Sequence, residues 1–315
     1  MEQGISFCTV TMQKKLIIIA GPTAVGKTAV AIEVAKHFDT QIISGDSRQC
    51  YKELNIGVAR PSLKELAAVK HHFIATHSIF EKVTAAGFEK YALEKTQQVF
   101  KTKDVLVMVG GTGLYIKAFC EGMDPIPEIP ENIHFDIIRL YKQHGLSWLQ
   151  SEIESQDPDF FTKGEMQNPV RMMRALEVVK STGQSILNYR KAVKTKRDFS
   201  TIKIGLELPK ENLLQNINAR VNNMIERGLV SEVEPLLVHQ EINALQTLGY
   251  KELFAYLDNK TSLKAAIETI KQNTRQYAKR QLTWFKKDKE FMWMKPDANE
   301  IIKKFSNIRE YDKNY

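Results

Sequence analysis

A glycine-rich segment near the start of the chain has the residue types and spacing of a phosphate-binding loop. It matches the pattern G-x-x-x-x-G-K-[ST] and reads Gly21-Pro22-Thr23-Ala24-Val25-Gly26-Lys27-Thr28. An apolar run precedes it and a helical pattern follows it, which is the context that the motif requires. The loop amides and Lys27 can bind phosphate oxygens, and the Thr28 hydroxyl can bind Mg²⁺.

The loop alone does not identify the phosphate compound. A typical nucleoside triphosphatase has a further apolar strand that ends in a magnesium-binding aspartate. Here the corresponding run, residues 105–109, ends in Gly110-Gly111-Thr112 without a carboxylate. This difference counts against a standard ATPase and leaves room for a diphosphate that is not a nucleotide.

Asp46 and Thr112 each follow a predicted strand, so both are expected at the same edge of a sheet. A carboxylate at that edge could accept a proton as a general base, or it could cap the start of a helix. Thr112 could bond a ligand or cap the next helix. The residues by themselves leave these alternatives open.

The elements that must position these residues are strands alternating with helices, which predicts an α/β fold with a P-loop NTPase-like parallel-sheet core. A proline-rich break after Gly122 and a helical pattern then predict a mainly helical insertion. The predicted strands are residues 16–20, 41–44, 104–109 and 202–208. The predicted parts are 13–122 (core, first part), 123–198 (insertion) and 199–315 (core completion and basic C-terminal helices).

The net charge of +8 is concentrated in two stretches. Such stretches are either solvated helix faces or binding surfaces for a polyanion, and two of them beside a phosphate loop favour the polyanion. The first comprises Lys163, Arg171, Arg174, Lys180, Arg190, Lys191, Lys194, Lys196 and Arg197, and the second Lys271, Arg275, Lys279, Arg280, Lys286, Lys287 and Lys289.

Composition excludes several other classes of protein. No apolar stretch approaches the roughly 20 residues that cross a bilayer, and no signal peptide is evident. Cys8, Cys50 and Cys120 have neither disulfide-like nor metal-knuckle spacing. We therefore expect a cytoplasmic protein with no membrane partner.

With these motifs placed, the chain resembles the tRNA dimethylallyltransferases of bacterial type over roughly Lys15 to Trp293. The matching blocks, in order, cover residues 21–28, 45–51, 57–61, 71–72, 110–115, 168–171, 174–177, 248–252 and 274–284. The chain departs from the family pattern at Ile74-Ala75-Thr76 and at Val170, which puts Val170 in doubt as an RNA contact and leaves Arg171 as a candidate.

The resemblance implies transfer of a dimethylallyl group from dimethylallyl diphosphate to N6 of the adenosine at tRNA position 37, with Mg²⁺ as cofactor. It implies Asp46 as the general base, Thr112 near the reacting groups, and Arg220 at the diphosphate. The target base would have to leave its stack to reach Asp46. The tRNA anticodon stem-loop is the implied partner of a monomer. The implied substrate contacts are Asp46, Ser47, Arg48, Gln49, Thr112, His134, Asn168, Arg171, Arg174, Gly249, Tyr250, Lys251, Lys279, Arg280, Gln281 and Thr283.

Three alternatives share part of this pattern. A small-molecule kinase would share the phosphate loop but leaves the basic segments unexplained. An adenylate isopentenyltransferase would share Asp46 and the loop but needs no basic insertion. A non-catalytic RNA-binding protein that uses the loop as a nucleotide switch does not account for Asp46.

Overall fold

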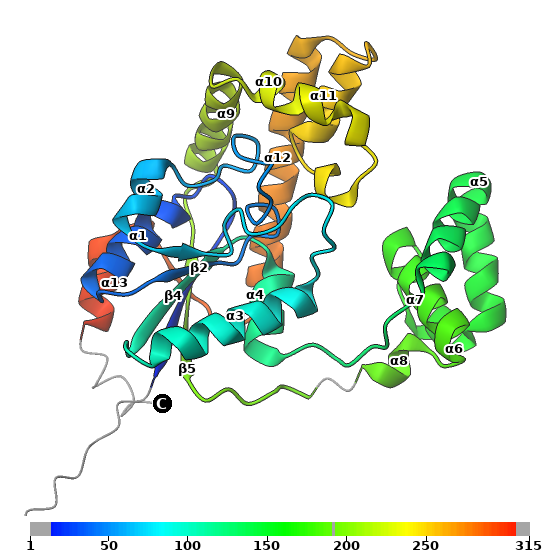
Figure 1. Ribbon diagram of the computed structural model, residues 1–315, viewed down its shortest axis with the longest axis horizontal. Coiled ribbons are helices and arrows are strands. Elements are labelled where there is room, and N and C mark those ends of the chain that lie inside the picture. Colours follow the sequence, from blue (N-terminus) through cyan, green and yellow to red (C-terminus); the bar gives the residue numbers. More distant parts are fainter. Residues whose placement is uncertain (1–13, 191–192, 307–315) are drawn as a thin grey trace, which may run out of the picture. The chain divides into compact units, whose positions relative to one another are not determined.

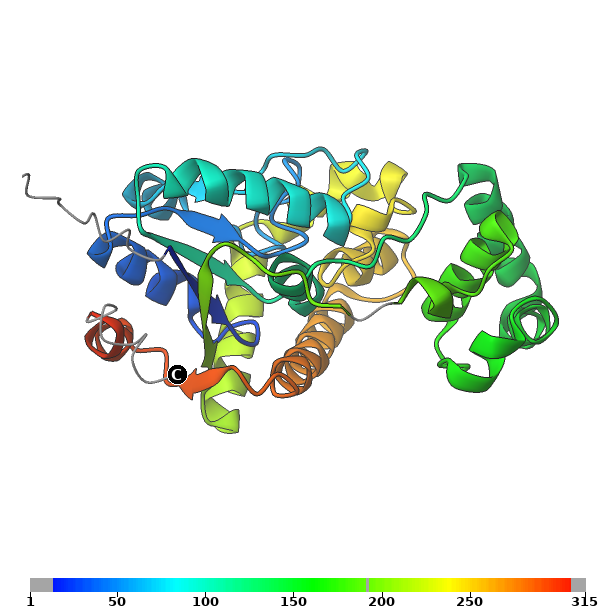
Figure 2. The same cartoon turned by 90° about the horizontal axis from the view of Figure 1, so that it is seen from below.

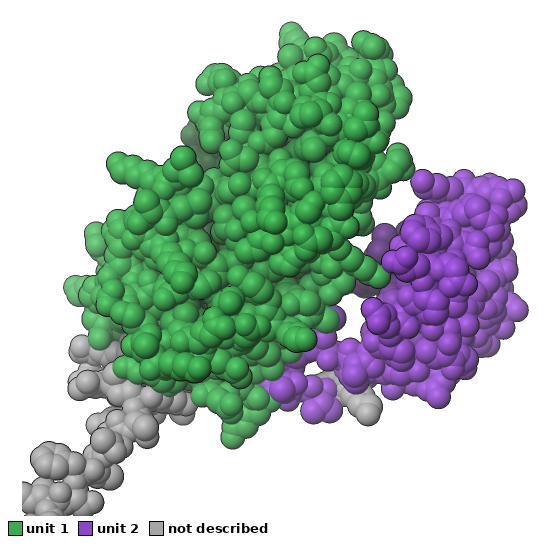
Figure 3. All heavy atoms as spheres, viewed as in Figure 1, with its two compact units in different colours: residues 1–120, 196–315 green, residues 121–195 purple. Residues whose placement is uncertain are grey.

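The computed structural model describes residues 14–190 and 193–306, and Cys8 and Lys191 lie outside these ranges (Figure 1). The chain divides into two compact units, coloured separately in Figure 3. The core unit comprises residues 1–120 and 196–315, and the insertion unit comprises residues 121–195. No helix of the described ranges is long and apolar enough to cross a membrane.

The core unit is built on a six-stranded, wholly parallel sheet with strand order β3-β2-β4-β1-β5-β6. Because parallel strands need crossover connections, their carboxyl ends and the loops that follow them gather at one edge. The strands are β1 (Lys15–Ala20), β2 (Ile42–Ser44), β3 (His71–His72), β4 (Val105–Gly110), β5 (Ser200–Leu206) and β6 (Met292–Met294).

Helices cover both faces of the sheet because its central strands are apolar on both sides. Leu16 and Ile18 of β1 join one hydrophobic cluster with α3, α4 and α11, while Ile17 and Ile19 join another with α1, α9 and α13 (Figure 2). The core helices are α1 (Lys27–His37), α2 (Leu63–Ala68), α3 (Ala85–Phe100), α4 (Gly113–Glu121), α9 (Lys210–Glu226), α10 (Leu229–Val233), η1 (Glu234–His239), η2 (Asn243–Leu245), α11 (Tyr250–Leu257), α12 (Leu263–Phe285) and α13 (Ala298–Phe305).

The insertion unit is helical and has a hydrophobic core of its own, in which Leu149, Phe160, Met172 and Leu176 are buried. Gly145 interrupts α5 with φ 75°, a conformation that glycine adopts without steric cost. The unit contains α5 (Glu131–Gln156), α6 (Pro158–Lys163), α7 (Pro169–Thr182) and α8 (Ile186–Tyr189).

Each of the four strands predicted from the sequence is present, within two residues of its expected limits. The two outer strands, β3 and β6, were not predicted. β3 consists of two partly exposed histidines and so has no apolar pattern, and β6 is apolar but, at three residues, too short to show the pattern of a strand.

One partly buried acid, Glu232, holds the loop at Ile56 and Gly57. The Glu232 carboxylate accepts hydrogen bonds from the amides of Ile56 and Gly57 at 2.7 and 3.0 Å. It also accepts one from the hydroxyl of Tyr250 at 2.6 Å. A Cβ atom on Gly57 would lie 2.5 Å from the Tyr250 ring, so this close packing requires glycine. The loop is thereby attached to the start of α11.

We expect Tyr250→Phe to lower the free energy of unfolding by about 1–3 kcal/mol, because it removes one of the two hydrogen bonds that Oε1 of Glu232 accepts. Chemical denaturation would measure the loss. The control is Tyr256→Phe on the same helix, whose hydroxyl makes no hydrogen bond with the described residues. Equal stability of the two variants would contradict this account of Glu232.

Candidate active site at the carboxyl edge of the sheet

The phosphate loop follows β1 and ends at the first turn of α1. Gly21, Ala24 and Gly26 have φ values of 149°, 65° and 98°, which turn the main chain sharply. A Cβ atom on Gly21 would lie 2.7 Å from the carbonyl oxygen of Leu206 in β5, so the loop approaches the sheet as closely as glycine allows. The Nζ of Lys27 donates to the carbonyl oxygen of Pro22 at 2.7 Å and lies inside the loop.

Helix α9 supports the phosphate loop from the side. Arg220 donates to Thr23 Oγ1 at 3.2 Å, and Asn216 donates to the carbonyl oxygen of Ala24 at 3.2 Å. Burial lowers the pKa of Arg220, and the negative charge of Asp46 opposes part of this shift. Arg220 therefore lies at the phosphate loop and within electrostatic reach of Asp46.

Asp46 uses its two carboxylate oxygens differently. Oδ1 accepts hydrogen bonds from the amides of Arg48 and Gln49 at 2.8 and 3.3 Å and so holds the turn after β2. Oδ2 receives no hydrogen bond from the described residues. Capping and general-base chemistry, which are alternatives on sequence grounds, are thus compatible in one side chain.

Thr112 links the turn at Asp46 to the loop after β4. Its Oγ1 accepts a hydrogen bond from the amide of Ser47 at 3.0 Å and donates to Ser47 Oγ at 3.3 Å. A further side-chain hydrogen bond joins it to Tyr277 of α12. Burial, then the charge of Asp46, raises the pKa of Tyr277 to about 12, so its hydroxyl stays protonated at neutral pH.

The charges of Lys27, Arg220 and Asp46 influence one another and suit the binding of an anion. Burial, followed by the positive charge of Arg220, lowers the pKa of Lys27 to about 7, and Asp46 opposes this shift. Lys27 therefore interacts electrostatically with both Arg220 and Asp46. A bound diphosphate would favour the charged form of Lys27.

Arg48 and Gln49, both predicted to contact substrate, bond the protein itself. Arg48 donates to the carbonyl oxygens of Asn243 and Ala244 at 3.0 and 3.1 Å. Gln49 donates to the carbonyl oxygens of Val58 and Ala59 at 3.3 and 3.0 Å. Gln49 Oε1 also accepts from Ser44 Oγ at 3.1 Å. These side chains hold the loop after β2, while Ser47 is tied to Thr112.

The predicted contacts in α11 and α12 divide into buried and exposed residues. Gly249 and Tyr250 are buried, so neither is available for direct contact with a substrate, and Tyr250 instead holds the loop at Ile56 and Gly57 through Glu232. Gln281 is also buried and bonds two loops of the site. The exposed members are Lys251, Lys279, Arg280 and Thr283.

In the insertion unit, one buried carboxylate holds two of the predicted contacts. Glu177 accepts from Arg174 at 3.1 Å and lies 2.7 Å from Nδ1 of His134. Asn168 caps α7 by accepting from the amide of Arg171, and the Arg171 side chain pairs with Glu165. His134, Arg171 and Arg174 are each about half exposed.

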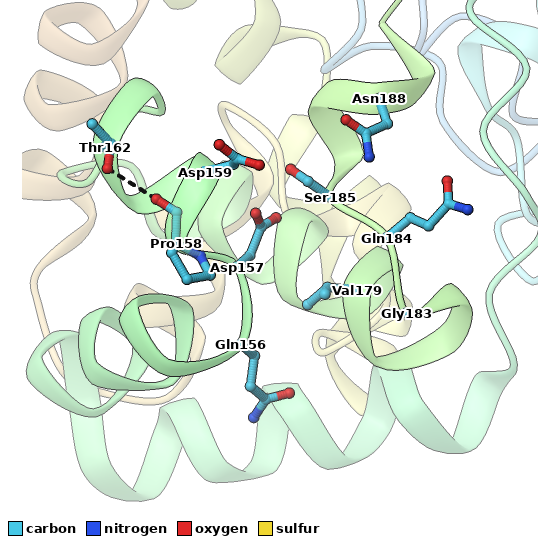
Figure 4. A pocket seen from close by; sticks show the side chains of 10 residues that line it. All are labelled: Gln156, Asp157, Pro158, Asp159, Thr162, Val179, Gly183, Gln184, Ser185 and Asn188. Atoms are coloured by element: carbon cyan, nitrogen blue, oxygen red, sulfur yellow. Dashed lines mark hydrogen bonds between the residues drawn. The ribbon is translucent and has the colours of Figure 1, made fainter.

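A hollow of about 500 Å³ in the insertion unit contains none of the predicted site residues (Figure 4). Two carboxylates and no lysine or arginine line it, which is the wrong charge for a phosphate. The buried Oδ2 of Asp157 has no hydrogen-bond partner, but it is closed off from solvent as well. The lining residues are Gln156, Asp157, Pro158, Asp159, Thr162, Val179, Gly183, Gln184, Ser185 and Asn188.

The donor set at the phosphate loop suits a loosely held Mg²⁺ ion. The described residues contain no group of three or more histidine, cysteine, aspartate or glutamate side chains that could hold a metal. Mg²⁺ is commonly held by few protein ligands, together with waters and substrate phosphates. A single hydroxyl, that of Thr28 at the start of α1, fits this kind of binding.

Sequence reasoning did not single out Tyr277 or Asn216, although both contact the site. The spacing of Tyr277, Gln281 and Trp284 (i, i+4 and i+7) places them on one helical face and was the available signal. Asn216 gives no such signal, because its partner lies 192 residues away.

Comparison with known proteins identifies the family. A family model described as IPP transferase matches residues 49–288. A tRNA dimethylallyltransferase of Christiangramia forsetii is 46% identical over 95% of this chain and 98% of its own. The chain belongs to the tRNA dimethylallyltransferase family.

Solved structures of this family have the same fold. The tRNA isopentenylpyrophosphate transferase of Bacillus halodurans has a TM-score of 0.69 and 32% identity, over 95% of this chain and 96% of that one. A eukaryotic dimethylallyltransferase acting on tRNA has a TM-score of 0.76 and 25% identity, over 96% of this chain and 80% of that one. The family resemblance and the α/β class expected from the sequence are both confirmed.

If Lys27 titrates near pH 7, binding of diphosphate should weaken as the pH rises. The lysine is charged below about pH 7 and neutral above it, so affinity should fall about tenfold per pH unit above that value. Calorimetric titration with inorganic diphosphate and Mg²⁺ would measure this loss. Lys27→Arg is the control, because its guanidinium stays charged while the ligand titrates identically. A wild-type to variant affinity ratio that does not change with pH would contradict the lowered pKa of Lys27.

Proposed function

We propose that this enzyme transfers a dimethylallyl group from dimethylallyl diphosphate to N6 of the adenosine at tRNA position 37, next to the anticodon. Membership of the tRNA dimethylallyltransferase family supports the reaction class. The observation that carries the proposal is the available Oδ2 of Asp46 beside a phosphate loop and Arg220. A proton acceptor and an anion site thus share one edge of the sheet.

In the proposed reaction, N6 of adenine bonds to C1 of the dimethylallyl group while the C1–O bond to diphosphate breaks. Asp46 takes the proton that the amine loses, through Oδ2. The loop amides, Lys27 and Arg220 stabilise the charge of the departing diphosphate. Mg²⁺, bound in part by Thr28, would supply further neutralisation of that charge.

Thr112 has a supporting part in this scheme. Its bonds to Ser47 and Tyr277 fix its hydroxyl next to the turn that bears Asp46. We assign Thr112 to the reacting base or the bridging phosphate oxygen. Because the phosphate loop, Asp46, Thr112 and Arg220 all belong to one core unit, we also propose a monomeric enzyme, acting where tRNA is found in the cytoplasm.

The RNA contacts belong to both units in this proposal. Phosphate oxygens would accept hydrogen bonds from exposed or partly exposed cationic and polar residues, which position the stem-loop without reading its sequence. In the core unit these are Lys251, Lys279, Arg280 and Thr283, and in the insertion unit His134, Asn168, Arg171 and Arg174.

Asp46→Asn tests the base. Asparagine still offers Oδ1 to the amides of Arg48 and Gln49, so the turn is kept while the proton acceptor is lost. We expect kcat to fall by about 10²–10⁴-fold with a KM for the donor changed by less than about threefold. The assay uses Mg²⁺, radiolabelled dimethylallyl diphosphate and an anticodon stem-loop with adenosine at the target position.

Two further acceptors decide between the proposal and its alternatives. A stem-loop with guanosine at the target position should take no label, and neither should free AMP. Label on AMP alone would assign the chain to the adenylate isopentenyltransferases. ATP hydrolysis without transfer to any acceptor would support a phosphate-transfer enzyme instead.

Arg171→Gln tests the insertion unit. If Arg171 neutralises one phosphate, the variant should bind the stem-loop more weakly, and the slope of log affinity against log salt should fall by about one. The kcat should stay unchanged. Arg139→Gln is the control, as an exposed arginine of the same unit that pairs with Asp136. An equal loss of stem-loop affinity in both variants would show that the effect comes from the net charge of the unit and not from a contact made by Arg171.

A further inference from the structure

The buried side chain of Gln281 connects the two sides of the active site. Its Oε1 accepts a hydrogen bond from the amide of Thr23 in the phosphate loop at 2.8 Å. Its Nε2 donates to the carbonyl oxygen of Gly111, in the loop after β4, at 2.9 Å. The two partners fix the orientation of the amide, because one must donate and the other must accept.

Each loop that Gln281 holds leads directly to a reacting group. On the leaving-group side, Thr23 also accepts a hydrogen bond from Arg220 through Oγ1. On the base side, Gly111 precedes Thr112, whose hydroxyl holds Ser47 next to Asp46. A displacement of Gln281 would therefore shift the surroundings of both Arg220 and Asp46.

The surrounding sequence fits this bridge. A Cβ atom on Gly111 would lie 2.3 Å from Nε2 of Gln281, and one on Gly113 would lie 2.2 Å from the ring of Trp284. Both glycines are thus needed for α12 to approach the loop. Tyr277, one turn before Gln281 on the same face of α12, bonds Thr112.

We propose that Gln281 is a positioning residue, which fixes the spacing between the bound diphosphate and Asp46 by bridging the phosphate loop and the loop after β4. The assignment rests on the proposed transfer reaction. Gln281 is only 6% exposed, so it acts inside the protein rather than as an RNA contact. Attack on C1 depends on correct placement of the donor and the base, and a misplacement of about 1 Å can cost about 100-fold in rate.

The first test compares Gln281→Ala with Gln272→Ala in the full-length enzyme. Gln272 is exposed and lies nine residues earlier on α12, which is about two and a half turns and thus the opposite face. We expect Gln281→Ala to lower kcat by about 10–100-fold, with a KM for dimethylallyl diphosphate changed by less than about threefold. Gln272→Ala should match the wild type.

A hydrogen-exchange measurement tests the bridge without using activity. The Thr23 amide loses its acceptor in Gln281→Ala, so its exchange should become faster, and it should not change in Gln272→Ala. If the wild type transferred no dimethylallyl group, the proposed reaction would fail while this measurement still reported on the bridge. Unchanged exchange at Thr23, or a wild-type kcat in Gln281→Ala, would overturn the assignment.

Gln281→Glu distinguishes a bridging role of Gln281 from a general packing role. The ionised carboxylate can still accept from the Thr23 amide, but it repels the carbonyl oxygen of Gly111. Protonation restores a donor, and burial favours the protonated form. The ratio of variant to wild-type kcat should therefore rise as the pH falls from about 8 to about 6. A ratio that is flat or falls over this range counts against the bridge.

Discussion

The carboxyl edge of the sheet is packed main chain against main chain, and the active site depends on this close approach. A Cβ atom on Gly110 would lie 2.2 Å from the carbonyl oxygen of Gly45, so the loops after β2 and β4 meet where only glycine fits. Gly21 has the same relation to the carbonyl oxygen of Leu206 in β5. The closeness of these loops lets short side chains such as Thr112 reach from one loop to the next.

The charges of the site are arranged around a space that an anion can neutralise. Two cations with lowered pKa values, Lys27 and Arg220, oppose each other, and Asp46 offsets part of that repulsion. In the proposed reaction, a bound diphosphate would relieve this repulsion between the two cations. This arrangement of charges would favour a strongly charged ligand over a weakly charged one.

Much of this fold follows from local sequence, because buried parallel strands are continuous apolar runs and the phosphate loop is a contiguous motif. Asp46 and Thr112 could be proposed as site residues from the sequence because each lies two residues after such a run. The internal roles of Gln281 and Gln49 were not predictable. Gln281 bonds Thr23 and Gly111, which are 258 and 170 residues away, so its partners appear only after the chain is folded.

The independent core of the insertion unit has a consequence for the order in which the chain folds. Its buried residues, from Ile129 to Ile186, all lie within one continuous segment, so they need only local contacts. The sheet, by contrast, places β1 beside β5, which follows about 185 residues later in the chain. Lys15, for example, lies opposite Ser200. During synthesis from the N-terminus, the helical unit can therefore close before the central strand acquires its second neighbour.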